Sequence, residues 1–405
     1  MVRRFLLLIS LALTISLGRE PLSSYADPIA QSSTQPATKI AQAYLDYFNR
    51  ALEKQDRGDN QGAIADYSEA IRLKPNYVDA YYNRGVVKSA LGDKQGAIAD
   101  YNEAIRLKPD DADAYVNRGN AKSDLGDNQG AIADYNEAIR LKPDDADAYV
   151  GRGLAKSALG DNQGAIADFN EAIRLKPDFA DAYYNRGIAK SDLGDKQGAI
   201  ADYNEAIRLK PNDADAYVNR GLAKSALGDN QGAIADYNEA IRLKPDYALA
   251  YSNRGVVKSD LGDKQGGIAD YSEAIRLKPD DADAYVNRGN AKSDLGDKQG
   301  GIADWNESIR LKPDYALAYY NRGVVKYDLG DKQGAITDYN EAININRNWG
   351  ARSLADAYYN RGVVKSDVGD KQGALTDYRK AAQLYQTQGN TESYQKVIKN
   401  IESLQ

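Results

Sequence analysis

Residues 78–111, VDAYYNRGVVKSALGDKQGAIADYNEAIRLKPDD, decide the fold of this chain, because the same pattern returns every 34 residues. The proline near the end of this stretch belongs to a series with constant spacing: Pro75, Pro109, Pro143, Pro177, Pro211, Pro245, Pro279 and Pro313. A fixed period of this length indicates stacked units that bury a continuous core between neighbours. Any function must then come from the surface that the stacking creates.

Local signals divide the stretch into two helices. The first helix is expected to end at Gly92, because glycine readily adopts the left-handed conformation that closes a helix. Asp93 can cap the second helix, which stops before Pro109 because a proline disfavours a helical residue in front of it. Asp110 or Asp111 can cap the first helix of the next unit. Each period is therefore predicted to be a helix–turn–helix.

Apolar residues recur at helical spacing in both predicted helices. They are Tyr81 and Gly85 in the first helix, and Ile98, Tyr101 and Ile105 in the second. A glycine inside a helix costs about 1 kcal/mol relative to alanine. The recurrence of Gly85 in later units therefore indicates a close approach between the two helices, with Ala97 facing the glycine.

The order and spacing of six residues resemble the tetratricopeptide repeat: Tyr81, Gly85, Ala97, Tyr101, Ala104 and Pro109. The match is close to a bacterial variant with Asn-Arg-Gly at residues 83–85, and it extends from Tyr44 to Gln388. The resemblance implies an all-α, right-handed superhelical solenoid. Ten units are expected, starting at Tyr44, Val78, Ala112, Ala146, Ala180, Ala214, Ala248, Ala282, Ala316 and Ala355.

The segments are predicted as follows: a signal peptide at 1–26, a flexible tether leading into the first helix at 27–43, nine repeat units at 44–349, an inserted turn at 350–354, a tenth unit at 355–388 and a capping helix at 389–405. The period breaks where Arg347 replaces the expected proline. The tether prediction rests on a polar, Ser- and Thr-rich composition that cannot bury enough apolar surface to fold.

The first 26 residues have the organisation of a secretory signal peptide. Arg3 and Arg4 precede a mostly apolar run, Phe5 to Leu17, and Ser24-Tyr25-Ala26 offers a cleavage site. The run is shorter than the roughly 20 residues that a membrane-spanning helix needs. We therefore expect export to the periplasm or the extracellular space, with no stable membrane insertion after cleavage. Removal of the leader changes the formal net charge from −6 to −8, because its four charged residues sum to +2.

Composition disfavours several classes of function. The chain has no cysteine and no histidine, which removes thiol and imidazole chemistry and the common zinc ligands. Its acidic total disfavours a nucleic-acid partner, and no run matches a calcium-binding loop. No candidate catalytic group stands outside the repeating pattern, so we expect no enzyme activity, no cofactor and no metal site.

By resemblance to tetratricopeptide proteins, the first helix of each unit is expected to line a concave groove that binds extended peptides. The recurring asparagine resembles the asparagine ladder of the O-GlcNAc transferase repeat domain, and amide groups can hold a peptide backbone of any sequence. Aromatic residues on the same face are expected to read ligand side chains. The candidate peptide-binding residues are Asn83, Asn117, Asn185, Asn219, Asn253, Asn287, Asn321 and Asn360, together with Tyr82, Tyr184, Tyr320 and Tyr359.

Recent duplication offers another explanation for the asparagines, since Asp110–Asp127 is repeated letter for letter at Asp280–Asp297. The preferred interpretation is a non-enzymatic scaffold of the cell envelope that binds protein or peptide ligands. The alternative is a structural or glycan-associated component of the envelope or of polysaccharide-export machinery. A lysine-rich clamp for C-terminal carboxylates is disfavoured, because Asp79, Asp113 and Asp147 stand at the corresponding positions.

Overall fold

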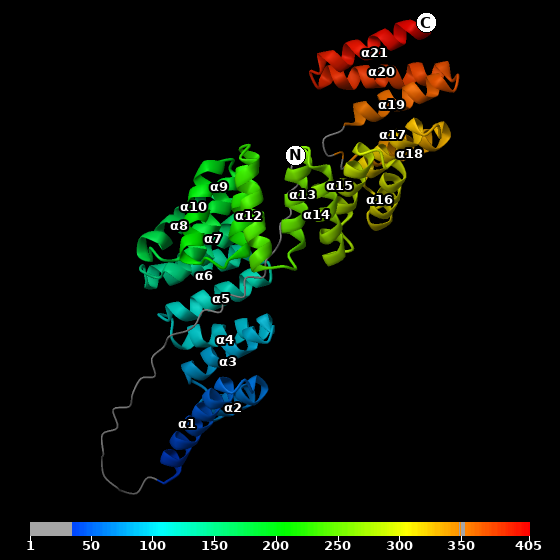
Figure 1. Ribbon diagram of the computed structural model, residues 1–405. Coiled ribbons are helices and arrows are strands. Elements are labelled where there is room, and N and C mark those ends of the chain that lie inside the picture. The colour runs from blue at the N-terminus through cyan, green and yellow to red at the C-terminus, as the bar shows by residue number, and fades with distance from the viewer. Residues whose placement is uncertain (1–34, 348, 350–352) are drawn as a thin grey trace. The chain divides into compact units, whose positions relative to one another are not determined.

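The structure is a computed structural model that describes residues 35–347, 349 and 353–405, with side chains described from Gln42 onward (Figure 1). Within these residues there are 21 helices and no strand. The chain divides after Pro211 into an N-terminal unit and a C-terminal unit, which are treated separately. The all-helical repeat architecture expected from the sequence is confirmed.

Five helix pairs form the N-terminal unit. They are α1 (Gln35–Asp56), α2 (Asn60–Leu73), α3 (Val78–Ala90), α4 (Lys94–Leu107), α5 (Ala112–Asp124), α6 (Asn128–Leu141), α7 (Ala146–Ala158), α8 (Asn162–Leu175), α9 (Ala180–Asp192) and α10 (Lys196–Leu209). Each odd-numbered helix packs against the even-numbered helix that follows it, and that helix packs against the next odd one.

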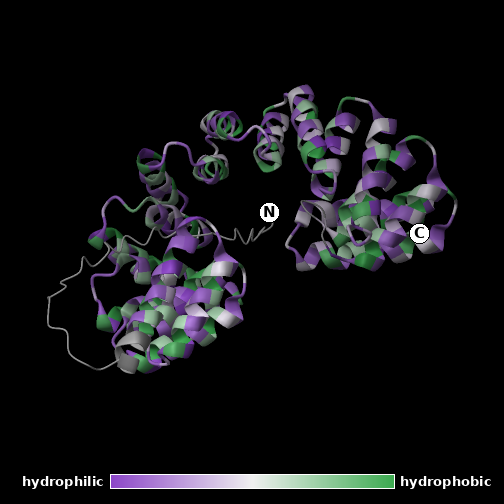
Figure 2. Ribbon diagram, turned by 90° about the horizontal axis from the view of Figure 1, so that it is seen from below, coloured by the Kyte–Doolittle hydropathy of each residue, from purple (hydrophilic) through white to green (hydrophobic). Residues whose placement is uncertain are grey.

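Five further pairs and a final helix form the C-terminal unit. They are α11 (Ala214–Ala226), α12 (Asn230–Leu243), α13 (Ala248–Asp260), α14 (Lys264–Leu277), α15 (Ala282–Asp294), α16 (Lys298–Leu311), α17 (Ala316–Asp328), α18 (Lys332–Ile345), α19 (Leu354–Asp367), α20 (Lys371–Thr387) and α21 (Thr391–Leu404). Figure 2 shows hydrophobic and hydrophilic residues mixed along the individual helices, as expected for helices that bury only one face.

The turn between α3 and α4 forms as its sequence predicts. Gly92 has a φ of +87°, in the left-handed region that favours glycine. Its N–H donates to the carbonyl of Ser89, and the N–H of Asp93 donates to that of Lys88. The carboxylate of Asp93 then accepts from the N–H of Gly96 at 2.9 Å and caps α4. The same turn recurs between the two helices of every pair.

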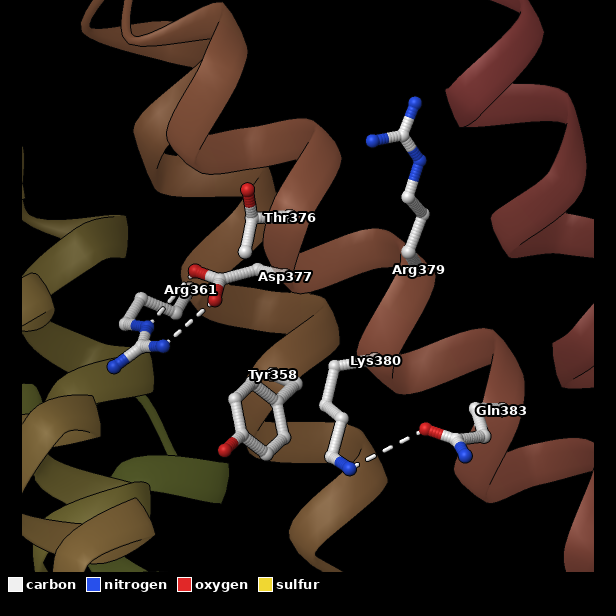
Figure 3. A pocket seen from close by; sticks show the side chains of 7 residues that line it. All are labelled: Tyr358, Arg361, Thr376, Asp377, Arg379, Lys380 and Gln383. Atoms are coloured by element: carbon white, nitrogen blue, oxygen red, sulfur yellow. Dashed lines mark hydrogen bonds and ion pairs between the residues drawn. The ribbon is translucent and has the colours of Figure 1, made fainter.

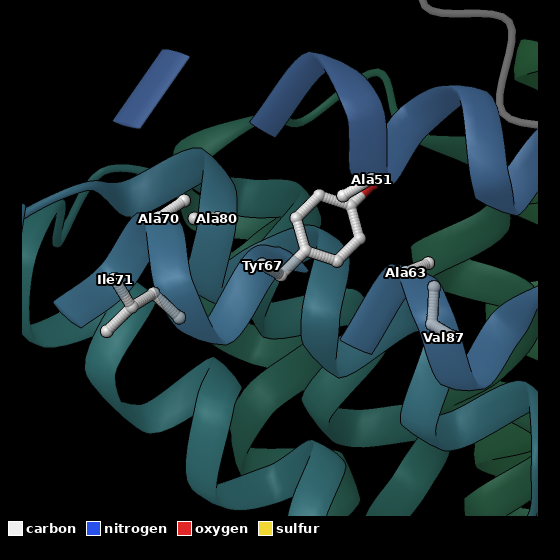
Figure 4. Packing of buried hydrophobic residues seen from close by; sticks show 7 residues of the cluster. All are labelled: Ala51, Ala63, Tyr67, Ala70, Ile71, Ala80 and Val87. Carbon is white, nitrogen blue, oxygen red and sulfur yellow. The ribbon is translucent and has the colours of Figure 1, made fainter. Parts of the chain in front are cut away.

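Alanine and tyrosine dominate the core. Figure 4 shows the first cluster, in which Tyr67 of α2 lies among small side chains from α1 and α3. The mid-helix glycine makes room for the equivalent tyrosine of its own pair. A Cβ built on Gly85 would lie 2.8 Å from the ring of Tyr101, closer than packed carbons allow. The expected close approach is therefore present, with the ring of Tyr101 as the nearest contact of Gly85.

Capping of the odd-numbered helices follows two patterns. Asp111 accepts from the N–H of Ala114 and caps α5, whereas Asp110 does not cap that helix. Four odd-numbered helices instead have an aromatic residue at this position and no side-chain cap: α3, α9, α13 and α17, after Tyr77, Phe179, Tyr247 and Tyr315. The sequence offered no aspartate at these four positions.

Two segments differ from their sequence-based descriptions. Helix α1 begins at Gln35, so the first helix starts within the segment predicted as a flexible tether leading into it. The helix extends from the first packed pair, and a proline such as Pro36 is tolerated in a first turn, where the backbone N–H has no helical partner. The remaining tether and the predicted signal peptide lie outside the described residues. Among the described helices, none is long and apolar enough to cross a bilayer.

The longer turn before the tenth pair ends in a well-formed helix start. Asn346 follows α18 with a φ of 45°, and Ser353 forms a reciprocal capping box with Asp356 at the start of α19.

The predicted capping helix is α21. Its Val397 is fully buried against α20, and its remaining apolar residues pack on the same cluster: Tyr394, Ile398, Ile401 and Leu404.

Candidate functional site

Within each unit the odd-numbered helices approach one another more closely than the even-numbered helices do. In the N-terminal unit α3 contacts α5, α5 contacts α7, and α7 contacts α9. In the C-terminal unit the same holds along the odd-numbered helices from α11 to α19. We call the surface on this side the inner face. It carries three positions of each odd-numbered helix, which in α3 are Asp79, Asn83 and Val86.

The asparagines of the inner face are all partly exposed, and the amide nitrogens of six of them donate hydrogen bonds to the protein. The Nδ2 atoms of Asn83, Asn185 and Asn219 donate to the backbone carbonyls four residues earlier, at 2.7, 2.8 and 3.0 Å. Asn321 donates to Oδ1 of Asn290 on the preceding odd-numbered helix at 2.9 Å. Because the nitrogens face the helices, the amide oxygens are the atoms that can face a ligand.

Two asparagines instead join neighbouring repeats through a tyrosine hydroxyl. Asn117 donates to Oη of Tyr82 at 2.8 Å, and Asn360 donates to Oη of Tyr320 at 2.7 Å. The capping helix continues this arrangement, since Asn400 donates to Oη of Tyr359 at 3.4 Å. These asparagines therefore contribute to the stacking of the repeats.

The expectation of an aromatic ligand-reading surface is wrong for three of the four tyrosines. Tyr82, Tyr184 and Tyr320 are only 4%, 8% and 5% exposed, and each ring lies against the core tyrosine of its own pair. Tyr359 is partly exposed, and Lys396 of α21 lies over its ring. These three tyrosines are buried because the fifth residue of an odd-numbered helix points between the two helices of its pair. A role in peptide binding remains a prediction for the asparagines and for Tyr359.

The interruption of the asparagine series at Gly151 has a packing cause. A Cβ at Gly151 would lie 2.6 Å from the ring of Tyr135, which belongs to the preceding repeat. The hydroxyl of Tyr135 donates to Oδ1 of Asn120 at 2.6 Å, and this bond holds the ring in place. Glycine at this position therefore leaves room for the neighbouring ring.

A repeated ion-pair network was missed by the sequence analysis. In α5 and α6, Arg118 binds both oxygens of Asp134 through Nε and Nη2 at 3.0 and 2.6 Å, and Lys122 reaches the same carboxylate at 2.8 Å. The aspartate is buried in all ten pairs: Asp66, Asp100, Asp134, Asp168, Asp202, Asp236, Asp270, Asp304, Asp338 and Asp377. The detectable signal was the constant 16-residue separation between the arginine of Asn-Arg-Gly and an aspartate.

The arginine also connects its pair to the preceding one. Nη1 of Arg118 donates to Oδ1 of Asn102 on α4 at 2.8 Å, and the guanidinium lies 5.3 Å from the centroid of the Tyr115 ring. A buried carboxylate is tolerated only when its charge and lone pairs are satisfied. In the first pair, the hydrogen bond from Arg50 lowers the pKa of Asp66 below its ordinary value. The network is structural, because its charged groups satisfy one another.

A shallow pocket of about 530 Å³ lies between α19 and α20, away from the inner-face positions (Figure 3). Its walls include Arg361, whose guanidinium is bound to Asp377, and Lys380, which donates to Gln383 at 3.3 Å. These charged groups already have partners within the chain. Two of the three basic side chains that line the pocket are therefore already bound within the chain. Among the described residues, no group of three acidic side chains is arranged to hold a metal ion.

Known protein families match the same repeating units that form the helix pairs of the structure. The TPR repeat family matches residues 54–92, 90–126, 119–160, 156–194, 189–228, 223–262, 259–296 and 294–330. Two further tetratricopeptide repeat patterns match residues 316–348 and 355–388. The chain belongs to the tetratricopeptide repeat family. No curated protein sequence matches this tetratricopeptide repeat chain.

Several solved structures are similar to this chain. A tetratricopeptide repeat protein from Parabacteroides merdae aligns with a TM-score of 0.50 at 22% identity, over 62% of this chain and 99% of that one. YrrB, described as a TPR protein with an unusual peptide-binding site, aligns at 25% identity with a TM-score of 0.40, over 45% of this chain and 95% of its own. Yeast Tom70 aligns over 90% of this chain and 96% of its own, at 16% identity and a TM-score of 0.41. The first of these similarities supports the fold alone.

Proposed function

We propose that the chain is a non-enzymatic scaffold that binds extended protein segments along its inner face. The observation that carries the proposal is the row of partly exposed asparagines with their nitrogens against the protein. Oriented in this way, the amide oxygens can accept hydrogen bonds from the backbone N–H groups of a ligand. A backbone-directed contact of this kind does not depend on ligand sequence, so one surface can hold several partners.

The test removes four inner-face asparagines of a single unit. A variant with Asn219, Asn253, Asn287 and Asn321, all in the C-terminal unit, changed to alanine is expected to lose most binding on a peptide array. Each hydrogen bond contributes only about 0.5–1.5 kcal/mol, but the losses add along one extended ligand. Asn219→Ala alone should weaken binding only a few-fold.

The matched control removes four amides elsewhere in the chain. Gln95, Gln129, Gln163 and Gln197 are exposed near the starts of even-numbered helices, and their replacement by alanine should leave binding unchanged. Circular dichroism should show the same helical content for both variants. If the asparagine variant folds normally and retains its ligands, the inner-face asparagines are a product of duplication and the binding proposal is wrong.

The alternative of a structural piece whose ends self-associate is less consistent with the first pair. Asp46 of α1 is exposed at the position where the other odd-numbered helices bury an alanine, such as Ala80 and Ala114. Ala80 packs against the preceding pair, so a carboxylate at this position would oppose docking of another unit. We therefore favour ligand binding over end-to-end assembly.

We further propose that the protein acts in the cell envelope after export. The support is the arrangement of charged, apolar and small residues in positions 1–26. N-terminal sequencing of the protein from envelope fractions should give a start near Asp27. Recovery of the chain from the cytosol with Met1 still present would contradict export.

A further inference from the structure

Helix α20 differs from the nine even-numbered helices before it at three exposed positions. Those helices have asparagine or serine followed by glutamate where α20 has Arg379 and Lys380. In eight of them an arginine three residues after the glutamate forms an ion pair with it, whereas α20 has the neutral Gln383 at that position. The last pair therefore has two adjacent cations where the other pairs have an acid.

These two cations have no acidic partner among the described residues. Arg379 has neither an ion pair nor a hydrogen bond there, whereas every other arginine in that part of the chain forms an ion pair. Lys380 donates to Oε1 of Gln383 at 3.3 Å, and this neutral partner leaves the charge of the ammonium group uncompensated.

The shallow pocket beside these cations offers hydrogen-bond donors but no free carboxylate (Figure 3). Its one acid, Asp377, is 2% exposed, and Arg361 and Lys365 bind both of its oxygens. The amide nitrogen of Gln383 stays available as a donor, because the amide oxygen accepts from Lys380. Positive charge and donors without a competing acid favour the binding of an oxyanion.

The positive charge is confined to the end of an acidic chain. The formal charge of α20 is +2, from Lys371, Arg379 and Lys380 against Asp377, whereas no other even-numbered helix exceeds zero. The whole chain has a formal charge of −6. A long polyanion such as nucleic acid needs a continuous basic surface, which this chain lacks. A short segment with two carboxylates needs only two cations.

We propose that the pocket between α19 and α20 binds a short acidic segment of a protein partner. The guanidinium of Arg379 can hold a carboxylate through two parallel hydrogen bonds, and Lys380 can attract another as a point charge. Figure 3 shows the two side chains pointing away from each other, so they engage two carboxylates rather than one. The pocket lies apart from the inner face, and this binding does not depend on the proposed function of that face.

The test uses the full chain and two fluorescent peptides, (Ser-Glu-Glu)₃ and (Ser-Gln-Gln)₃. Anisotropy titrations at low ionic strength should show the glutamate peptide binding at least about fivefold more tightly than the glutamine peptide. Added salt should reduce this preference, because exposed charge pairs are screened.

Two matched variants locate the effect. The triple variant Arg379→Asn, Lys380→Glu and Gln383→Arg gives α20 the residues that α4 has at the same positions, and it should lose the preference for glutamate. The control, Lys371→Gln with Lys399→Gln, removes the same net charge from exposed positions outside the pocket and should keep the preference. Circular dichroism should show the same helical content for both variants.

Equal binding of the two peptides, or equal loss of preference in the two variants, would overturn the proposal. Binding of phosphatidylglycerol vesicles in place of the glutamate peptide would also overturn it, because the cations would then serve a membrane surface.

The variant that lacks four inner-face asparagines separates this inference from the proposed function. It should bind the glutamate peptide as the parent chain does, even if it loses its ligands on the peptide array. If the glutamate peptide requires those asparagines and not the cations of α20, the acidic-segment site is wrong while binding at the inner face stands.

Discussion

The N-terminal and C-terminal units are built from the same repeat but present different chemistry on their inner faces. In both, an arginine and a lysine neutralise a buried aspartate in every pair, as in the Arg118–Asp134 and Arg288–Asp304 pairs. At the starts of the odd-numbered helices the units diverge, because Asp215 and Asp283 are bound by tyrosine hydroxyls whereas Asp147 faces Phe179. The comparison teaches that repeats with the same scaffold can differ in the hydrogen bonding of a helix-start carboxylate through one loop residue that stands 32 positions later.

The largest expected effect concerns the end of the C-terminal unit. Deletion of Thr391–Gln405 should expose Tyr378, Ala382 and Tyr385, which pack against α21. Each large apolar side chain contributes about 1.5–3 kcal/mol on burial, so the loss should reach several kcal/mol. Hydrogen exchange should accelerate in α19 and α20 and remain unchanged in α3 to α8. Unchanged protection in α19 and α20 would show that the helix is not required as a cap.

The next prediction tests whether the two units share one scaffold. Asp134→Ala in the N-terminal unit and Asp304→Ala in the C-terminal unit each leave two cations without their buried partner. Breaking a buried pair in this way costs about 3–5 kcal/mol. Urea denaturation, followed by hydrogen exchange to locate the change, should give similar losses for both variants. A clearly smaller loss in one unit would mean that the network is not equivalent in the two.

A smaller effect is expected where the asparagine series is interrupted. Gly151→Asn restores the sequence pattern but places a side chain against the ring of Tyr135. Overpacking of this kind costs about 1–3 kcal/mol. The double variant Gly151→Asn with Tyr135→Ala removes the clash and should recover part of that loss, measured relative to Tyr135→Ala alone. A stable Gly151→Asn variant would mean that the glycine is not required by packing.

The smallest effect on stability bears most directly on the comparison. Phe179→Tyr should give Asp147 the hydroxyl donor that Asp215 and Asp283 possess, at a gain of about 0.5–1.5 kcal/mol. A hydrogen bond to the charged form lowers the pKa of a carboxyl, so the raised pKa of Asp147 should fall, which an NMR titration can follow.

The reverse change completes this experiment. Tyr247→Phe together with Tyr315→Phe removes the two hydroxyls from the C-terminal unit and should lower its stability by about 0.5–1.5 kcal/mol for each lost hydrogen bond, measured by urea denaturation. If the double variant is as stable as the parent chain, these hydroxyls do not stabilise the starts of α11 and α15, and the difference between the units has no effect on stability.

The sequence by itself determined the elements of the fold. The 34-residue period, the left-handed glycine at Gly92 and the cap at Asp93 are local or periodic signals, so the ten helix pairs and the capping helix could be predicted. The onset of α1 could not, because a helix can extend beyond the residues that favour it once a packed neighbour has nucleated it. The spacing of Arg118 and Asp134 was visible, but its meaning depended on knowing that both side chains are buried.

The tertiary structure alone decided which side chains of the inner face are available. Tyr82 and Asn83 are adjacent in sequence, yet the tyrosine is buried and the asparagine is partly exposed. The way in which the helices pack decides which of the two residues points into the core and which lies on the inner face. The pairing of Asp283 with Tyr315 spans 32 residues and forms only when a whole pair has folded. The periodic spacing of apolar residues predicts the buried face of each helix separately. A contact between residues 32 positions apart depends in addition on how successive helices stack.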